Sequence, residues 1–122
     1  MTVQPVGLEE LQGRLGEVGL LLLDVRSAVE FAGEAGYGCD PRQGHIPGAR
    51  HLDVQELASC VSLEAVRELV AAPEGTEIVA YCHSGGRSAY AAEILVAAGY
   101  AARNYAGSWH EWSSVETLPV ET

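Results

Sequence analysis

Short, nearly continuous apolar runs alternate along this chain with segments in which apolar residues recur at helical spacing. The runs at residues 20–25 and 77–81 have the length and apolarity of strands that are buried on both faces. Leucines at positions 8, 11 and 15 and the apolar stripe of residues 63–70 predict helices beside them. Such alternation predicts an α/β domain in which helices cover both faces of a central parallel sheet.

Residues at fixed offsets mark further helix ends. Two Ser-x-x-Glu capping boxes, which begin at Ser27 and Ser108, predict short helices at those positions. Residues 87–98 are expected to form a well-buried helix that ends at Gly99. Residues 49–54 are expected to form a short strand.

The length and charge of the chain limit its organisation and its partners. A chain of 122 residues suits one domain over residues 1–122, with a core at about 3–114 and a loose tail at 115–122. A net charge of −10 repels phosphate backbones and anionic lipids, so neither a nucleic-acid nor a membrane partner is expected. Three cysteines do not resemble a secreted disulfide framework, and no signal-peptide pattern is visible, so a reducing, cytoplasmic setting is expected.

The segment YCHSGGRS at residues 81–88 carries the strongest chemical signal. It follows a predicted strand and opens a predicted helix. Cys82 is therefore expected at the carboxyl end of a strand, where parallel α/β sheets bind their ligands. Gly85 and Gly86 allow the backbone to curl tightly, and the successive amides can then form a nest that holds an anion.

The same segment is expected to activate the thiol of Cys82. Amides from Ser84 to Ser88 and the guanidinium of Arg87 favour the thiolate, and such surroundings lower a thiol pKa from about 8.5 into a range of about 3.5–7.5. The alternative is a buried, inert cysteine before a turn. His83 either helps to bind an anion or carry a proton, or faces solvent.

Four segments of the chain resemble the rhodanese-like family and follow one another in the order typical of that family. They are LLLDVRSAVEF, GHIPGA, IVAYCHSGGRSAYAAEILVAAGY and YAGSWHEW. The resemblance implies a five-stranded parallel sheet and a persulfide on Cys82. It implies a sulfurtransferase that moves a sulfane sulfur from an anionic donor, thiosulfate or a persulfide, to a thiol or cyanide acceptor, with a sulfur-relay protein as a further candidate partner. No metal and no organic cofactor are expected.

Loop length separates two chemistries among proteins that resemble this fold. The loop from Cys82 to Arg87 has six residues, which is similar to the length in sulfurtransferases of the family. Related phosphatases and arsenate reductases have one residue more, which enlarges the nest for a tetrahedral oxyanion. A phosphatase or arsenate reductase, and a non-catalytic module that binds or regulates a partner, remain the alternative functions.

Five residues outside the loop are candidates for the surrounding cleft. The resemblance places Asp24 and Arg26 near the mouth of the site, and the alternative is that they tie a strand to neighbouring backbone. His45 is expected to be a hydrogen-bonding clamp. Arg50 faces either the cleft or solvent, and Trp109 packs against the sheet or walls the pocket.

The two remaining cysteines are weighed separately. Residues 33–43 are rich in glycine and depart from the family pattern by lengthening the loop before GHIPGA. Cys39 lies in this insertion and is either a second, resolving thiol or an incidental exposed cysteine. Cys60 lies between apolar residues and is expected to be buried and structural.

Overall fold

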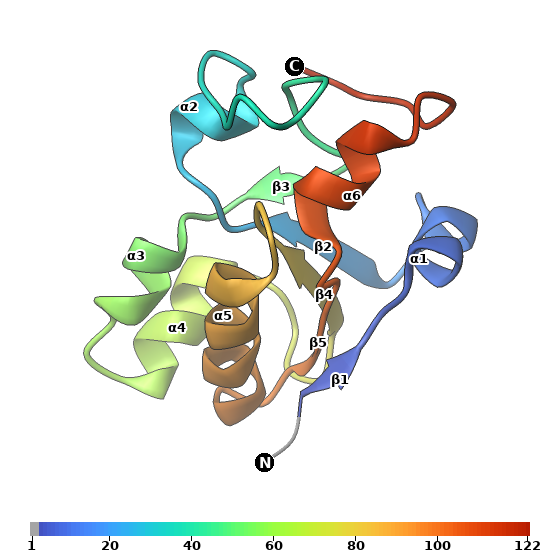
Figure 1. Cartoon of the computed structure of the whole chain (residues 1–122). Coiled ribbons are helices and arrows are strands. Elements are labelled where there is room, and N and C mark those ends of the chain that lie inside the picture. The colour runs from blue at the N-terminus through green and yellow to red at the C-terminus, as the bar shows by residue number, and fades with distance from the viewer. Residues whose placement is uncertain (1–2) are drawn as a thin grey trace.

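The computed structural model describes residues 3–122, and its centre is a sheet whose five strands all run parallel in the order β1-β5-β4-β2-β3 (Figure 1). The strands are β1 (Gln4–Pro5), β2 (Leu20–Asp24), β3 (Arg50–His51), β4 (Glu77–Tyr81) and β5 (Ala101–Asn104). The helices are α1 (Leu8–Arg14), α2 (Ala28–Phe31), α3 (Val54–Ala58), α4 (Leu63–Val70), α5 (Gly86–Ala97) and α6 (Ser108–Ser114). The expected parallel sheet of about five strands is confirmed.

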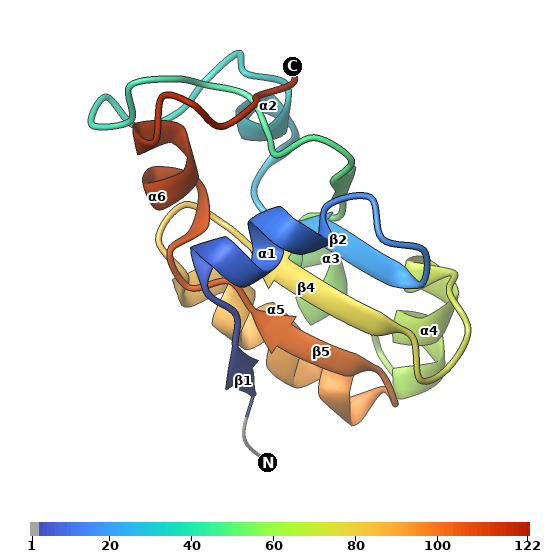
Figure 2. The same ribbon diagram turned by 90° about the vertical axis from the view of Figure 1, so that its right-hand side faces the viewer.

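Helices cover both faces of this sheet, as the alternation in the sequence predicts. Helices α3, α4 and α5 lie against one face, and α1 and α6 lie against the other (Figures 1 and 2). Side chains of β4 alternate between the two cores: Ile78 and Ala80 pack on the α5 side, and Val79 and Tyr81 pack on the α6 side. Cys82 continues the alternation and therefore belongs to the core on the α5 side.

One of the two predicted capping boxes is present and the other is not. The Ser27 amide donates to Glu30 Oε1 at 3.2 Å and α2 begins directly after it, as predicted. The prediction of a capping box at Ser108 is wrong, although a short helix does begin there. Ser108 is already inside α6, its hydroxyl donates to the Tyr105 carbonyl at 2.8 Å, and the Glu111 carboxylate accepts from the Tyr105 hydroxyl at 2.8 Å.

The two shortest strands were the hardest to predict. Strand β3 occupies only Arg50–His51 of the predicted strand at residues 49–54, because Asp53 starts α3 by accepting a hydrogen bond from the Gln55 amide at 2.9 Å. Strand β1, Gln4–Pro5, pairs with β5 and was not predicted, since two residues carry no readable alternation.

Residues 115–122 do not form the loose tail that was expected. Leu118 is buried, and the indole of Trp112 donates to the Pro119 carbonyl at 2.8 Å. The backbones of His45 and Glu121 exchange two hydrogen bonds, of 2.7 and 2.9 Å. The packed part of the fold therefore continues past residue 114 and ties the end of the chain to the segment GHIPGA.

Candidate active site

Cys82 lies where β4 ends and the chain curls into α5, and hydrogen-bond donors surround its sulfur. The side chain is buried, with 1% exposure. The Gly85 amide donates to Sγ at 3.1 Å, and the Ser88 hydroxyl lies 3.4 Å from it. The backbone amides of Ser84 and Ser88 also favour the thiolate and lower the pKa of the Cys82 thiol. Of the predicted nest of amides, the Gly85 amide makes a direct hydrogen bond to the sulfur.

Two effects oppose each other on the pKa of the Cys82 thiol. Burial raises this pKa, because the thiolate loses contact with water. Hydrogen bonds from the Ser88 side chain and from the amides of Ser88, Gly85 and Ser84 stabilise the thiolate and lower the pKa. The hydrogen bonds prevail, so the pKa of Cys82 lies below its ordinary value and the nucleophilic form is favoured.

The two adjacent glycines of the loop have different roles. Gly85 has a φ of 98°, and a Cβ placed on it would lie 2.7 Å from the Ala106 carbonyl oxygen. Only glycine fits this conformation and this approach of two backbones. Gly86 begins α5, and among the described residues 3–122 a Cβ there would meet no heavy atom within 4 Å beyond its chain neighbours and the adjacent backbone of α5.

Ser108 supports the loop from the opposite side, and the sequence did not indicate it. Its hydroxyl accepts a hydrogen bond from the Cys82 amide at 3.1 Å, donates to the Tyr105 carbonyl and lies 4.0 Å from Cys82 Sγ. Its φ of 56° is uncommon for a serine and is maintained by these bonds. The segment YAGSWHEW contains Ser108, but its Ser-x-x-Glu spacing matches a capping box, and Ser108 was therefore assigned to a helix start and not to the cysteine loop.

Arg87 pairs with a carboxylate at the edge of the loop. Its guanidinium donates to the two oxygens of Glu30 at 2.9 and 3.2 Å, and its side chain is 34% exposed. Burial raises the pKa of Glu30, but hydrogen bonds from Arg87 and Ser27 outweigh burial and lower the pKa to about 2. The ring of donors around the sulfur is therefore made of amides and hydroxyls, and the charge of Arg87 is shared with Glu30.

The remaining loop side chains face away from the nest. The Ser84 side chain is exposed, so this residue acts on the sulfur through its amide. The ring of His83 is only 15% exposed: its Nε2 lies 3.1 and 3.2 Å from the carboxylate oxygens of Asp40, and Tyr37 stacks on it at 3.8 Å. Residues of the insertion therefore hold His83 in place, and it is not a free solvent-facing side chain.

Asp24 and Arg26 form a fully buried ion pair behind the site. Arg26 Nη2 lies 2.6 Å from Asp24 Oδ2 and 2.6 Å from the Gly44 carbonyl oxygen. The guanidinium also lies 5.1 Å from the ring of Trp109, which is itself completely buried. This arrangement matches the structural alternative for Asp24 and Arg26, and Trp109 packs in the core as expected.

His45 and Arg50 also stabilise backbone. His45 Nδ1 donates to the Phe31 carbonyl at 2.8 Å and its ring stacks on Phe31 at 3.7 Å, so it is the expected clamp. Arg50 Nη2 donates to the Val70 carbonyl at 2.6 Å, at the end of α4. Arg50 therefore neither faces the cleft nor stands free in solvent, because the last turn of a helix offers it unpaired carbonyls.

The insertion forms one wall of a pocket beside the loop. This pocket has a volume of about 230 Å³ and is lined by Ser27, Val29, Glu30, Ala35, Gly36 and Tyr37. Glu30 contacts Arg87 and Tyr37 stacks on His83, so the pocket borders two side chains of the cysteine loop.

The other cysteines lie outside the nest. Cys60 was expected to be buried and structural; it is partly buried, packs against the core on the α5 side, and its thiol donates to the Glu56 carbonyl at 3.3 Å. Cys39 is exposed in the insertion, and its Sγ lies 3.9 Å from ring nitrogens of both His83 and His110.

Comparison with known proteins agrees with this geometry. The family model of the rhodanese-like domain matches residues 7–115. A probable 3-mercaptopyruvate sulfurtransferase of Pseudomonas aeruginosa is 37% identical over 126 residues, which cover 92% of this chain and 42% of that protein. A human thiosulfate:glutathione sulfurtransferase is 35% identical over 119 residues, which cover 92% of this chain and 95% of that protein.

Solved structures show the same likeness. The crystal structure of a probable thiosulfate sulfurtransferase superposes with a TM-score of 0.82 at 41% identity, over 96% of this chain and 47% of that one. This chain therefore spans less than half the length of that structure and of the Pseudomonas relative, and nearly the whole length of the human relative.

Proposed function

Because the chain belongs to the rhodanese-like domain family, we propose that it is a sulfurtransferase in which Cys82 carries the sulfur as a persulfide. The observation that carries this proposal is the ring of donors around Cys82 Sγ, in which the Gly85 amide and the Ser88 hydroxyl lie at 3.1 and 3.4 Å. Donors in these positions stabilise the attacking thiolate and the persulfide anion that replaces it.

The proposed reaction consists of two displacements at sulfur. The Cys82 thiolate attacks the outer sulfur of the donor; with thiosulfate, a new S–S bond forms, the old one breaks, and sulfite leaves with the electron pair. A thiol or cyanide acceptor then attacks the outer sulfur of the persulfide, and Cys82 leaves as a thiolate. Donor and acceptor react in turn with the same cysteine, so ping-pong kinetics are expected.

Donor and acceptor are proposed from the site and the relatives together. A thiosulfate donor is supported by the guanidinium of Arg87, one third exposed beside the loop, and by the names of the relatives. A small thiol acceptor is supported by the pocket along Glu30 and Tyr37 and by the human thiosulfate:glutathione sulfurtransferase. A sulfur-relay protein remains a further candidate acceptor.

The alternatives are less well supported. A phosphatase or arsenate reductase needs donors for three oxygens of a tetrahedral ion, whereas the six-residue loop directs its amides at one sulfur atom. A non-catalytic module has no need of a buried thiol whose pKa is lowered by four hydrogen bonds. Both alternatives are tested by the same experiment as the main proposal.

A cytoplasmic setting is part of the proposal. Its support is that Cys39, Cys60 and Cys82 are all free thiols, which a reducing compartment preserves. Within the described residues 3–122, none of the helices has the length and apolarity required to cross a bilayer.

Intact-mass measurement tests the proposed function. The wild-type chain should gain one sulfur atom on incubation with thiosulfate and lose it on addition of cyanide. Cys82→Ser should gain none, and Cys60→Ser, a matched change at another free thiol, should gain one. Three outcomes would overturn the proposal. They are a gain of sulfur by Cys82→Ser, no gain by the wild type from thiosulfate, 3-mercaptopyruvate or glutathione persulfide, and rapid hydrolysis of an aryl phosphate by the wild type.

A further inference from the structure

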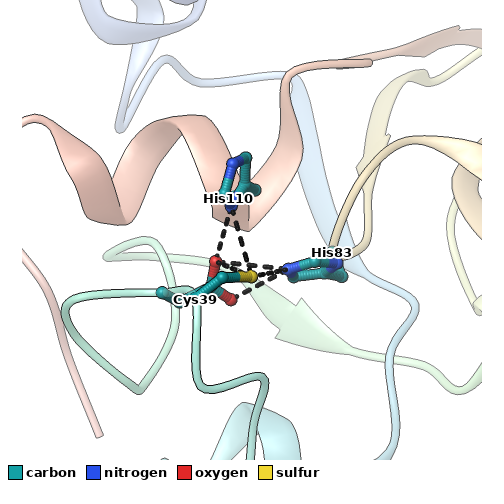
Figure 3. A group of neighbouring side chains, drawn as sticks. Cys39, His83 and His110 are labelled. Carbon is teal, nitrogen blue, oxygen red and sulfur yellow. Dashed lines mark hydrogen bonds and ion pairs between the residues drawn. The ribbon is translucent and has the colours of Figure 1, made fainter.

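Four side chains that are able to bind a metal ion converge beside the cysteine loop (Figure 3). Cys39 and Asp40 belong to the insertion, His83 belongs to the loop after β4, and His110 belongs to α6. One ligand atom from each residue lies within 4.8 Å of the ligand atoms of the other three. Three separate segments of the chain therefore bring a thiol, a carboxylate and two imidazoles to one point.

The distances between these atoms suit a tetrahedral ion. Asp40 Oδ1 lies 2.8 Å from His110 Nδ1 and 3.2 Å from His83 Nε2. Cys39 Sγ lies 3.8 Å from the same oxygen and 3.9 Å from each of the two ring nitrogens. Zinc bonds of about 2.0–2.3 Å place tetrahedral ligand atoms about 3.3–3.6 Å apart. The observed separations lie on both sides of this range, so small side-chain rotations bring the four atoms onto one ion.

Asp40 has a buried charge that the protein only partly satisfies. Its side chain is 1% exposed, and its Oδ2 accepts no hydrogen bond from the described residues, although His83 Nε2 lies 3.1 Å away. Burial of a carboxylate is costly unless the charge is paired or coordinates a metal. A cation at the centre of the cluster supplies the missing partner.

The two imidazoles are already oriented by other contacts. Tyr37 stacks on His83 with 24° between the rings, and the His110 amide donates to the His83 carbonyl at 3.0 Å. The Asp40 amide donates to the Tyr37 carbonyl at 3.1 Å. Supporting contacts of this kind fix ligand orientation in metal sites, so little order has to be gained on binding.

We propose that Cys39, Asp40, His83 and His110 bind one divalent transition-metal ion, with Zn²⁺ as the best match. One thiolate, one carboxylate and two neutral imidazoles balance a charge of +2, and the Cys39 thiol releases its proton to solvent on binding. Sulfur and imidazole ligands select zinc over calcium or magnesium, which prefer oxygen. The net charge of −10 attracts cations to the protein.

The ion acts as a clamp and takes no part in the proposed sulfur transfer. Four protein ligands close the coordination sphere, which is typical of structural zinc sites. The ion joins the insertion to the cysteine loop and to α6, and it thereby holds Tyr37, a wall of the pocket at the loop. This inference does not depend on the proposed function, because Cys82 is not one of the ligands.

Metal titration of the whole chain tests the site. Protein that has been treated with a chelator and desalted is titrated with zinc chloride by calorimetry, and with Co²⁺ as a spectroscopic probe. One ion should bind per chain, the Co²⁺ form should show a thiolate-to-metal charge-transfer band, and zinc should raise the melting temperature, since it binds only the folded form tightly.

Variants locate the ligands. Cys39→Ser and His110→Ala should each weaken zinc binding about 100-fold or more, since even residues that contact a metal only through its ligands contribute about 10–100-fold to metal affinity. Cys39→Ser should also remove the charge-transfer band of the Co²⁺ form. Cys60→Ser and Cys82→Ser should keep both. Circular dichroism of the chelated proteins checks that each variant is folded. Undiminished zinc binding by Cys39→Ser, loss of the band in Cys82→Ser, or no binding by the wild type at micromolar zinc would overturn the proposal.

Discussion

The Ser88 hydroxyl lies 3.4 Å from Cys82 Sγ, and both side chains are buried. Ser88→Ala removes this donor while the amides of the loop remain. A hydrogen bond to a charged group contributes about 1.5–3 kcal/mol, so kcat/KM for sulfur transfer from thiosulfate to cyanide is expected to fall about 10- to 150-fold. Steady-state kinetics at fixed pH measure the effect.

Ser84→Ala is the matched control. The Ser84 side chain is exposed and only its amide reaches the sulfur, so this variant should keep the kinetics of the wild type. Equal rates for Ser88→Ala and the wild type would show that the hydroxyl does not assist the thiolate or the persulfide.

The two loop glycines should respond differently to alanine. Gly85→Ala places a Cβ 2.7 Å from the Ala106 carbonyl oxygen at a φ of 98°, so the loop must open and persulfide formation should be lost. Gly86→Ala adds a methyl at the start of α5 in open space and should leave persulfide formation intact. Intact mass after thiosulfate compares the two. A normal sulfur gain by Gly85→Ala would contradict the geometry of the nest.

Asp24→Ala should be strongly destabilising. It leaves the guanidinium of Arg26, which is 1% exposed, without its carboxylate, and such a loss costs about 3–5 kcal/mol. Urea unfolding measures the change in free energy. Glu10→Ala, which removes the exposed partner of Arg103, should cost only a small fraction of this. Equal losses of unfolding free energy in Asp24→Ala and Glu10→Ala would contradict this prediction, because they would show that the Arg26 guanidinium finds another partner when Asp24 is removed.

Glu30 should make stability depend on acid. Its pKa is about 2 in the folded chain against an ordinary value of 4.5, so its contribution is complete above about pH 4.5 and is lost as the pH falls towards 2. Solvent screening limits this contribution to about 1 kcal/mol. Glu30→Gln should therefore be less stable than the wild type at pH 7, and the difference should vanish near pH 2.

Urea unfolding at several pH values follows that difference. Glu34→Gln changes an exposed carboxylate of the neighbouring loop and should follow the wild type at every pH. A constant difference between Glu30→Gln and the wild type from pH 7 to pH 2 would mean that the Arg87 pair does not lower the pKa of Glu30.

Local sequence patterns determined most of the architecture and the position of Cys82 between a strand and a helix. The apolar runs of β2 and β4 and the stripe of α4 each lie within one segment, so their periodicity could be read directly. The same holds for Cys82, because a strand, a curled loop and a helix start follow one another without interruption. The two-residue strand β1 could not be predicted and β3 was predicted too long, since pairing partners elsewhere in the chain define both strands.

Only the tertiary structure decided what surrounds the cysteine loop. Ser108 reaches the Cys82 amide across 26 residues of sequence, Glu30 reaches Arg87 across 57, and His110 reaches Asp40 across 70. Local periodicity and spacing do not connect residues so far apart in the sequence. They meet because a parallel sheet brings the ends of its strands, and the loops after them, to one edge. The role of Ser108, the partner of Arg87 and the cluster around Asp40 therefore follow from the fold and not from any motif.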